Sequence, residues 1–276
     1  MEQTAKHAAP TKQAEFGWID LAASDLEAQT KFYETLFGWT HEDVSTQPRQ
    51  VYRLFSLNGA QVAGASPMTS QHQFPARIHS TWNTYITVGD LDEVVASAAQ
   101  LGAKIIVPPM DVMSRRIAGV QDPTGAVVYF RQPSSQDERF AVGELGTLMW
   151  SDLNTSDPQA AMDFYSKLLG WDVKPSPTQS GMPYWMIEVA GEQVGGITRQ
   201  RTSFMPRSHT QNKETGDAPS WLVYFGVPSA SEAARTVRAE NGAVLMEPMD
   251  VGPTTFATFA DPGGAVFTVM EPVRQP

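Results

Sequence analysis

The 276-residue sequence contains no cysteine, which excludes disulfide bonds, thiolate metal sites, iron–sulfur clusters and a cysteine nucleophile. Histidine is scarce, with five residues, so few nitrogen ligands are available to a metal. Basic residues number 20 against 30 acidic ones, and the net charge of −10 argues against a nucleic-acid partner. The sequence lacks a run of roughly 18 apolar residues, and residues 1–14 lack the apolar core of a signal peptide. We therefore expect a cytoplasmic protein that does not bind a membrane.

What the sequence does contain is an internal repeat. A shift of 132 positions aligns residues 18–39 with residues 150–171 without a gap, and 11 of the 22 aligned residues are identical. A repeat of this length indicates a duplicated domain, because solenoid repeats span about 20–50 residues. The predicted organisation is a polar tail (1–14), a first domain (15–131), a linker (132–143) and a second domain (144–272).

Each copy follows the order strand, helix and short strands, and then repeats that order. Ser24 and Ser156 have the spacing of a capping box, so we expect both to begin helices that Gly38 and Gly170 end. Asp90 and Ser229 repeat the signal for a second helix in each copy. Strand-forming runs follow each helix, and an Asp-Pro-x-Gly turn follows the second helix of each copy. The chain is thus predicted to contain four βαβββ units.

The shared motif begins with Trp18-Ile-Asp-Leu, continues through Phe32-Tyr33 and ends with Leu36-Phe37-Gly38-Trp39. With its second copy, it resembles the vicinal oxygen chelate superfamily, also called glyoxalase/bleomycin-resistance/dioxygenase. The resemblance points to the two-domain bacterial branch, whose members are labelled glyoxalase-like or hydroxylase. It implies an α+β fold of tandem glyoxalase-like domains, in which the mixed sheets of four βαβββ units curl into cups. This fold serves lyases, dioxygenases and drug-sequestering binders, so it does not decide the function.

The resemblance also implies where metal ligands would lie, since metal enzymes of the superfamily line the cup with His, Glu and often Gln. It places one ligand at Trp18 or Trp150 and another at Tyr129 or Thr268, and none of these is a plausible ligand. A divalent metal needs three or four converging donor atoms. We therefore expect no cofactor, and a divalent metal held by unusual ligands is the alternative.

Without a metal, the cup is expected to be a site for an organic ligand. Strand alternation puts Trp18 and Asp20 on one face of their strand, and Trp150 and Asp152 on the matching face of the second copy. The resemblance makes this face concave. Paired tryptophans also pack in cores, and the two aspartates could instead bind backbone groups at a strand end.

Further residues complete the expected site. Tyr129 faces the same cup by the family mapping, and Tyr85 and Tyr224 lie in adjacent strands. Arg53 is the remaining candidate for ligand binding. An aromatic wall with an acid suits a flat or cationic small organic molecule.

Four functions follow from these residues. The preferred hypothesis is a binding protein for a small organic molecule, which acts as a monomer or a homodimer. One alternative is a metal-dependent lyase, dioxygenase or hydroxylase that uses His79 or His209. Another is a metal-free enzyme in which Asp20 or Asp152 is the base and Tyr129 or Tyr224 the acid. The last is a structural or regulatory protein.

Two glycine positions and two long loops complete the sequence pattern. Gly64 and Gly195-Gly196 indicate β-bulges or a close backbone approach. Residues 66–81 and 198–220 are the longest irregular stretches. The second is either a solvated loop or a guide for an anionic substrate, because it carries Arg199, Arg201, Arg207, His209 and Lys213.

Overall fold

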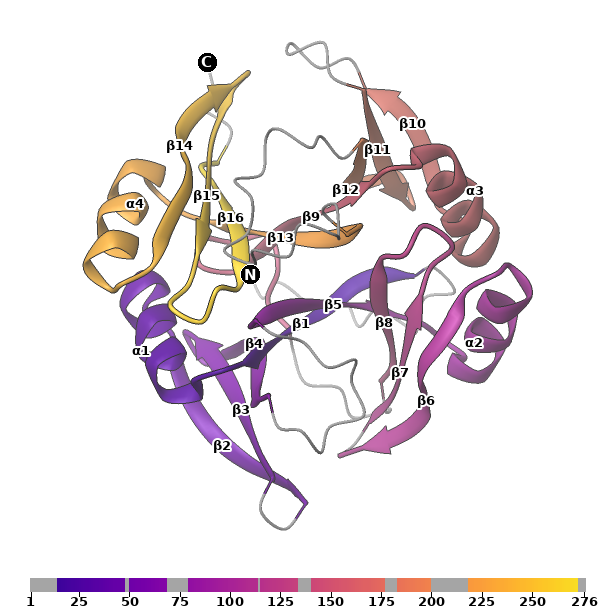
Figure 1. The fold of residues 1–276 in the computed structure, drawn as a ribbon, viewed down its shortest axis with the longest axis horizontal. Coiled ribbons are helices and arrows are strands. Elements are labelled where there is room, and N and C mark those ends of the chain that lie inside the picture. The colour runs from indigo at the N-terminus through magenta and orange to yellow at the C-terminus, as the bar shows by residue number, and fades with distance from the viewer. Residues whose placement is uncertain are drawn as a thin grey trace, which may run out of the picture.

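The computed structural model describes residues 14–47, 50–68, 79–113, 115–133, 140–176, 183–199 and 218–272. These residues form two eight-stranded mixed sheets with two helices each, one sheet above the other in Figure 1. The architecture is the predicted tandem α+β fold.

The first sheet has the strand order β2-β3-β4-β1-β5-β8-β7-β6. Its strands are β1 (Glu15–Ala23), β2 (Thr40–Gln47), β3 (Gln50–Leu57), β4 (Ala60–Pro67), β5 (Thr81–Thr87), β6 (Lys104–Val112), β7 (Arg115–Gln121) and β8 (Val127–Gln132). The second sheet repeats this order as β10-β11-β12-β9-β13-β16-β15-β14. Its strands are β9 (Leu148–Thr155), β10 (Asp172–Ser176), β11 (Tyr184–Val189), β12 (Glu192–Arg199), β13 (Ser220–Gly226), β14 (Ala243–Val251), β15 (Thr254–Ala260) and β16 (Val266–Met270).

Each sheet consists of two βαβββ units that meet along an antiparallel pair of strands. In the first sheet β1 pairs with β5, and in the second β9 pairs with β13. Both sheets curl away from each other, so their concave faces open at opposite ends of the molecule (Figure 1). We call the concave face of the first sheet cup 1 and that of the second sheet cup 2. Each cup is therefore built from units of a single chain.

The four helices are α1 (Leu26–Phe37), α2 (Leu91–Gln100), α3 (Pro158–Leu169) and α4 (Ala230–Ala239). Gly38 and Gly170 end α1 and α3 in the left-handed conformation, with φ of 72° and 70°, as predicted. Among the described residues, no helix is long and apolar enough to cross a bilayer.

The predicted caps of the first helix in each copy are wrong by one residue. Asp25 and Asp157 cap α1 and α3, because their carboxylates accept the free backbone N–H of the first turn. The Ser24 hydroxyl instead accepts a hydrogen bond from Ser80. Asp90 and Ser229 cap α2 and α4 as predicted.

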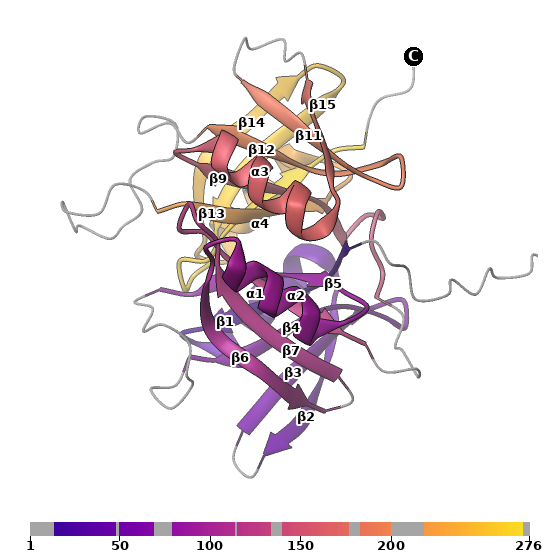
Figure 2. The ribbon, with the colours of Figure 1, turned by 90° about the vertical axis from the view of Figure 1, so that its right-hand side faces the viewer.

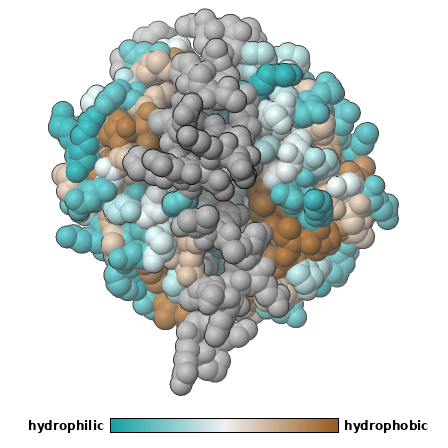
Figure 3. Space-filling model, in the orientation of Figure 1, coloured by the Kyte–Doolittle hydropathy of each residue, from teal (hydrophilic) through white to brown (hydrophobic). Residues whose placement is uncertain are grey.

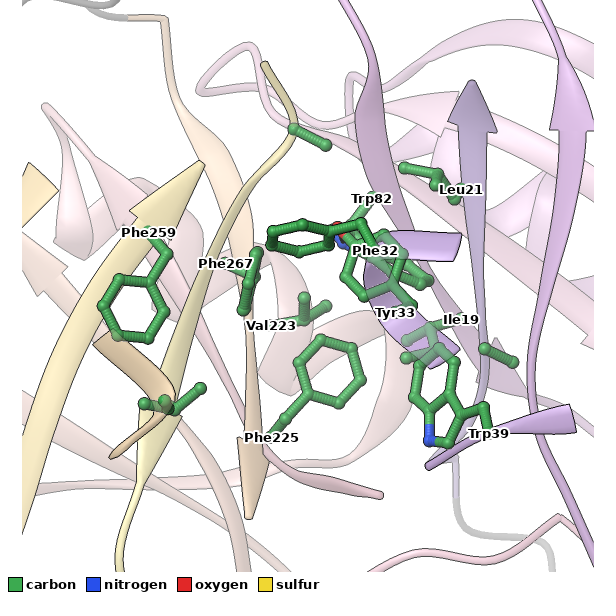
Figure 4. Packing of buried hydrophobic residues seen from close by; sticks show 14 of the residues in the cluster. Ile19, Leu21, Phe32, Tyr33, Trp39, Trp82, Val223, Phe225, Phe259 and Phe267 are labelled. Carbon is green, nitrogen blue, oxygen red and sulfur yellow. Dashed lines mark hydrogen bonds between the residues drawn. The ribbon is translucent and has the colours of Figure 1, made fainter. Parts of the chain in front are cut away.

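The two sheets share their hydrophobic cores. Figure 2 shows α2 and α3 side by side at the boundary, and α1 packs against α4 in the same way. One core joins α1 and its strands to β13–β16, and the other joins α2 and its strands to the third unit. In Figure 4 the first core contains Ile19, Leu21, Phe32, Tyr33, Trp39, Trp82, Val223, Phe225, Phe259 and Phe267. Neither sheet has a complete core of its own.

Two buried hydrogen-bond networks connect the sheets at the Asp-Pro-x-Gly turns. The Tyr33 hydroxyl donates to Asp261 of the second sheet at 2.9 Å and accepts from the Trp82 indole. Its counterpart Tyr165 donates to Asp122 of the first sheet, also at 2.9 Å. The duplicated Phe-Tyr pairs therefore serve packing, and their hydroxyls also join the domains.

Figure 3 shows the surface seen in Figure 1, which is largely hydrophilic or neutral apart from a few hydrophobic areas. The end strands β6 and β14 both present exposed methionines at matching positions, Met110 and Met249. Scattered exposed apolar residues of this kind are ordinary in folded proteins.

Candidate functional site

The structure brings the predicted residues of the first copy together on the concave face. Trp18 and Asp20 of β1 face cup 1 because alternate residues of a strand point to the same side. Tyr85 of β5 lies opposite Trp18 in the strand register, and Tyr129 of β8 lies opposite Tyr85. All four side chains are buried.

Asp20 is the acceptor at the centre of cup 1. The Tyr85 hydroxyl donates to its Oδ2 at 2.7 Å, and the Asn83 amide donates to its Oδ1 at 2.8 Å. The Trp18 indole donates to the hydroxyl of Tyr52 at 2.9 Å. Asp20 therefore anchors side chains of the cup and does not cap a strand end.

Two arginines, from β7 and β8, approach the Trp18 ring. The guanidinium carbon of Arg115 lies 5.3 Å from the ring centroid and that of Arg131 lies 5.9 Å away, within cation–π range. Arg131 also donates to the Gly17 carbonyl at 2.9 Å. Both cations lower the pKa of Tyr52. Burial and the charge of Asp20 raise it by more, so the net shift is upward.

Cup 1 is filled by its own side chains. The Tyr129 ring stacks on Tyr85 with a centroid distance of 5.0 Å and an interplanar angle of 27°. Phe140, which follows the first sheet in the chain, packs on Trp18 at 5.1 Å. With Leu54 and Val107, these rings form a separate hydrophobic cluster. Cup 1 is thus a third small core of the molecule.

Cup 2 repeats the hydrogen-bonded framework around Asp152. Oδ1 of Asp152 accepts from the Trp150 indole at 2.9 Å and from the Tyr184 hydroxyl at 2.8 Å. Oδ2 accepts from the Tyr224 hydroxyl at 2.7 Å. Both carboxylate oxygens are therefore engaged, and three aromatic rings are held in fixed positions around one acid.

Burial controls the protonation of these groups. It raises the pKa of the Asp152 carboxyl above its ordinary value, while the donors Tyr224, Tyr184 and Trp150 act in the opposite direction. Burial, reinforced by the nearby Asp152 charge, also raises the pKa of the Tyr184 and Tyr224 hydroxyls. The tyrosines therefore stay protonated and remain hydrogen-bond donors to the acid.

In the described part of the chain, the second cup lacks the side chains that fill the first. In cup 2, Thr268 lies opposite Tyr224. In cup 1, the equivalent position opposite Tyr85 is occupied by Tyr129. Trp150 and Tyr224 are half-buried where Trp18 and Tyr85 are buried, and the described residues form no hydrophobic cluster in cup 2 that corresponds to the one in cup 1. Cup 2 is therefore the more accessible of the two aromatic faces.

Methionines line much of the remaining concave face of cup 2. Strand register places Met186 at the position of Leu54, and Met246 at the position of Val107. Met270 similarly takes the place of Arg131, and all three methionines are half-buried. Methionine is flexible and polarisable, which suits a face that adapts to an apolar ligand.

Glycines 64 and 196 explain how the tyrosine hydroxyls reach the acids. A Cβ on Gly64 would lie 1.9 Å from the Tyr52 hydroxyl, and one on Gly196 would lie 2.0 Å from the Tyr184 hydroxyl. The predicted close backbone approach is confirmed at both positions, since only glycine leaves room for the phenol.

Arg53 lies on the opposite side of the first sheet from the cup. It is buried under α1 and binds Asp43 at 2.7 Å, Glu27 at 2.9 Å and Thr30 at 2.8 Å. Its neighbour Tyr52 faces the cup, because consecutive strand residues point to opposite faces. Arg53 therefore does not belong with the ligand-binding residues among which the sequence placed it.

The donors on the two concave faces do not fit a divalent metal. Each cup offers one aspartate, and its oxygens accept hydrogen bonds from tyrosine, asparagine or tryptophan. Across the described ranges, no group of three or more His, Asp or Glu side chains lies close enough to hold a metal ion. A metal needs several converging oxygen or nitrogen donors, and the described part of neither concave face provides them.

The remaining candidates from the sequence lie elsewhere. His79 is at the boundary between the sheets, 3.8 Å from the position that a Cβ on Gly264 would take. His209 and most of the basic stretch within residues 198–220 lie outside the described residues. The structure thus gives His79 no place in either cup.

A family model places this architecture among known proteins. The model for the Glyoxalase/Bleomycin resistance protein/Dioxygenase superfamily matches residues 15–130 and again residues 145–269. The chain belongs to this superfamily. The resemblance seen in the repeated motifs is therefore confirmed.

Two relatives cover nearly the whole chain. CFP32 of Mycobacterium bovis, a provisionally named glyoxylase, is 33% identical over 96% of this chain and 97% of its own length. The anthracycline biosynthesis protein DnrV of Streptomyces peucetius is 30% identical over 92% of each chain.

Solved structures share the fold at low sequence identity. The Mn(II)-bound glyoxalase from Novosphingobium aromaticivorans has a TM-score of 0.63 at 15% identity, covering 95% of this chain and 83% of that one. The 2,3-dioxygenase LapB from Pseudomonas sp. KL28 has a TM-score of 0.62 at 13% identity, covering 97% and 95%. At this identity the likeness establishes the fold alone.

Several residues of the cups were missing from the sequence-based set. Tyr52 and Tyr184 occupy matching positions in the repeat, and each precedes a matching glycine that makes room for its hydroxyl. This repeated pairing of a tyrosine with a glycine could have predicted that both tyrosines belong to the cups. Arg115 and Arg131 gave no such signal, because the second copy has Thr254 and Met270 at their positions.

Proposed function

We propose that the chain binds a small organic molecule with a flat aromatic ring in cup 2, and that cup 1 is a packed structural counterpart. The observation that carries this proposal is the contrast in burial of equivalent rings. Trp18 and Tyr85 are 3% and 4% exposed, whereas Trp150 and Tyr224 are half-buried. Half-buried rings on a fixed framework offer stacking surface to a ligand.

Asp152 supports this site as a positioning residue. Its two oxygens accept from three aromatic side chains, so it fixes their orientation before a ligand arrives. A site whose rings are already ordered loses less conformational entropy on binding. The acid–base alternative draws no support from this arrangement, because both oxygens of the carboxylate are already engaged.

The lining of cup 2 is consistent with an apolar ligand of variable shape. Met186 and Met246 can adjust their side chains around different ring systems. A relative named for anthracycline biosynthesis makes aromatic compounds a reasonable first class to test. We further propose that neither a nucleic acid nor a membrane is a partner of the chain.

Tryptophan fluorescence quenching and calorimetric titration test the proposal. The probes are naphthalene, 2-naphthol and the phenyltrimethylammonium ion, titrated into wild type, Trp150→Ala and Trp18→Ala. We expect at least one probe to bind wild type and to lose about tenfold in affinity in Trp150→Ala, because one stacking ring is removed.

Trp18→Ala is the matched control, and it should bind the probe as wild type does. Circular dichroism shows whether both variants are folded. Equal affinity of wild type and Trp150→Ala, or a loss confined to Trp18→Ala, would place the ligand outside cup 2 and refute the proposal.

A further inference from the structure

The side chain of Tyr129 supplies the aromatic ring that covers Tyr85 in cup 1. The ring extends from β8, stacks on Tyr85 and lies directly over Gly119 of β7. A Cβ at Gly119 would lie 2.7 Å from Cε1 of Tyr129, so the missing side chain makes room for the ring. The first sheet is therefore built to hold a phenol ring against the Tyr85 face.

Cup 2 has the same backbone at this place but no ring. Thr268 takes the position of Tyr129, and Thr258 takes the position of Gly119, as the register of β15 and β16 shows. Threonine is much smaller than tyrosine, so β16 brings no aromatic ring to Tyr224. Phe256 meets Tyr224 only edge-on, at a centroid distance of 6.0 Å and an angle of 86°.

The two threonines also bring hydrogen-bonding groups to an otherwise aromatic and methionine-rich face. Their hydroxyl oxygens lie 3.0 Å apart, and both residues are buried, with Thr258 8% exposed and Thr268 2%. One hydroxyl donates to the other, which leaves the second proton of the pair for a further acceptor. Asp152 is not available in the same way, since its oxygens already accept from Trp150, Tyr184 and Tyr224.

We propose that cup 2 takes an oxygen-bearing aromatic ring, a phenol or a quinone, in the place that Tyr129 occupies in cup 1. The ring stacks on Tyr224, and its oxygen binds the Thr258–Thr268 hydroxyl pair. Tyr224 offers its face and not its proton, because the hydroxyl donates to Asp152 at 2.7 Å. This inference rests on the proposed function and assigns the ligand class and its orientation.

Two variants distinguish the contribution of the ligand's aromatic ring from that of its oxygen. The double variant Thr258→Val/Thr268→Val keeps the size of both side chains and removes both hydroxyls, whereas Thr268→Tyr supplies the ring that cup 1 already has. The probes are 2-naphthol and naphthalene, which differ by one hydroxyl group, and binding is measured by fluorescence quenching with thermal unfolding as the folding check.

We expect wild type to bind 2-naphthol about tenfold more tightly than naphthalene, which is the contribution of roughly one hydrogen bond in a dry site. In the double variant Thr258→Val/Thr268→Val this preference should disappear while naphthalene binding is retained, because neither hydroxyl is left to bind the ligand oxygen. In Thr268→Tyr both probes should lose binding, because the new ring occupies their place. If that variant does not fold, Thr258→Val/Thr268→Val still decides the question.

The possible failures differ in meaning. If Thr258→Val/Thr268→Val keeps the tenfold preference, or Thr268→Tyr binds like wild type, the inference is overturned although an aromatic ligand still binds in cup 2. If wild type binds neither probe and Trp150→Ala affects no other probe, the proposed function falls, and the inference falls with it.

Discussion

Cup 1 and cup 2 share one hydrogen-bonded framework and differ in the side chains around it. Both keep a tryptophan and two tyrosines around one buried aspartate. Equivalent positions around this framework carry different residues. With the cup 1 residue first, these pairs are Asn83 and Leu222, Arg115 and Thr254, Gly119 and Thr258, Tyr129 and Thr268, and Arg131 and Met270. A few substitutions at its edge thus separate a packed face from an accessible one.

The electrostatic surroundings of the two faces differ as well. In cup 1, Arg115 and Arg131 lie over Trp18, and their charges reach Tyr52. Their counterparts in cup 2 are uncharged, and burial raises the pKa of the Asp152 carboxyl. The same hydrogen-bonded framework therefore persists with and without nearby cations, because the aromatic donors satisfy the acid in both cups.

The largest test of this comparison is the stability cost of removing each tryptophan. Trp18→Ala should lower the free energy of unfolding by about 3–5 kcal/mol, since it leaves a cavity in a packed cluster. Trp150→Ala should cost about 2 kcal/mol less, because its ring is half-buried. Urea unfolding of both variants measures the difference. Equal costs would show that cup 2 is packed as tightly as cup 1.

A smaller effect is expected from Phe140, which packs on Trp18, whereas no aromatic ring among the described residues packs on Trp150. Phe140→Ala should destabilise the protein by about 1 kcal/mol and shift tryptophan emission to longer wavelength, because Trp18 becomes more exposed. Val142→Ala, at an exposed position nearby, is the control and should change stability by less than about 0.5 kcal/mol. Unchanged emission in Phe140→Ala would mean that other side chains alone cover Trp18.

The smallest effect concerns the pH dependence that Asp152 contributes. Because the pKa of its carboxyl is higher in the folded protein than the unfolded value of about 3.8, its stabilising contribution is present below 3.8 and lost as pH rises through the folded pKa. The stability advantage of wild type over Asp152→Asn should therefore shrink with rising pH, by about 1.4 kcal/mol for each unit of pKa elevation. Urea unfolding of both proteins between pH 3.5 and pH 7 measures this change. An advantage that grows with pH would show that hydrogen bonding lowers the pKa below 3.8 instead.

Much of this arrangement was predictable from the repeat. Trp18 and Asp20 share a face because strands alternate with a period of two, and the concave face follows from the family resemblance. Gly64 predicted a close approach, and the Tyr52 hydroxyl is the group that approaches. Arg53 was wrongly grouped with the ligand-binding residues. The same alternation, applied to β3, puts it on the face opposite Tyr52.

The sequence by itself determined the duplicated fold, the superfamily and the matched aromatic and acidic positions, because repeats and strand periodicity are local properties of the chain. Only the tertiary structure decided that the two cups differ in packing. Whether Tyr129 stacks on Tyr85, or Thr268 leaves Tyr224 half-buried, depends on which side chains distant strands bring together. Register and sheet curvature set those contacts, and neither can be read from one strand alone.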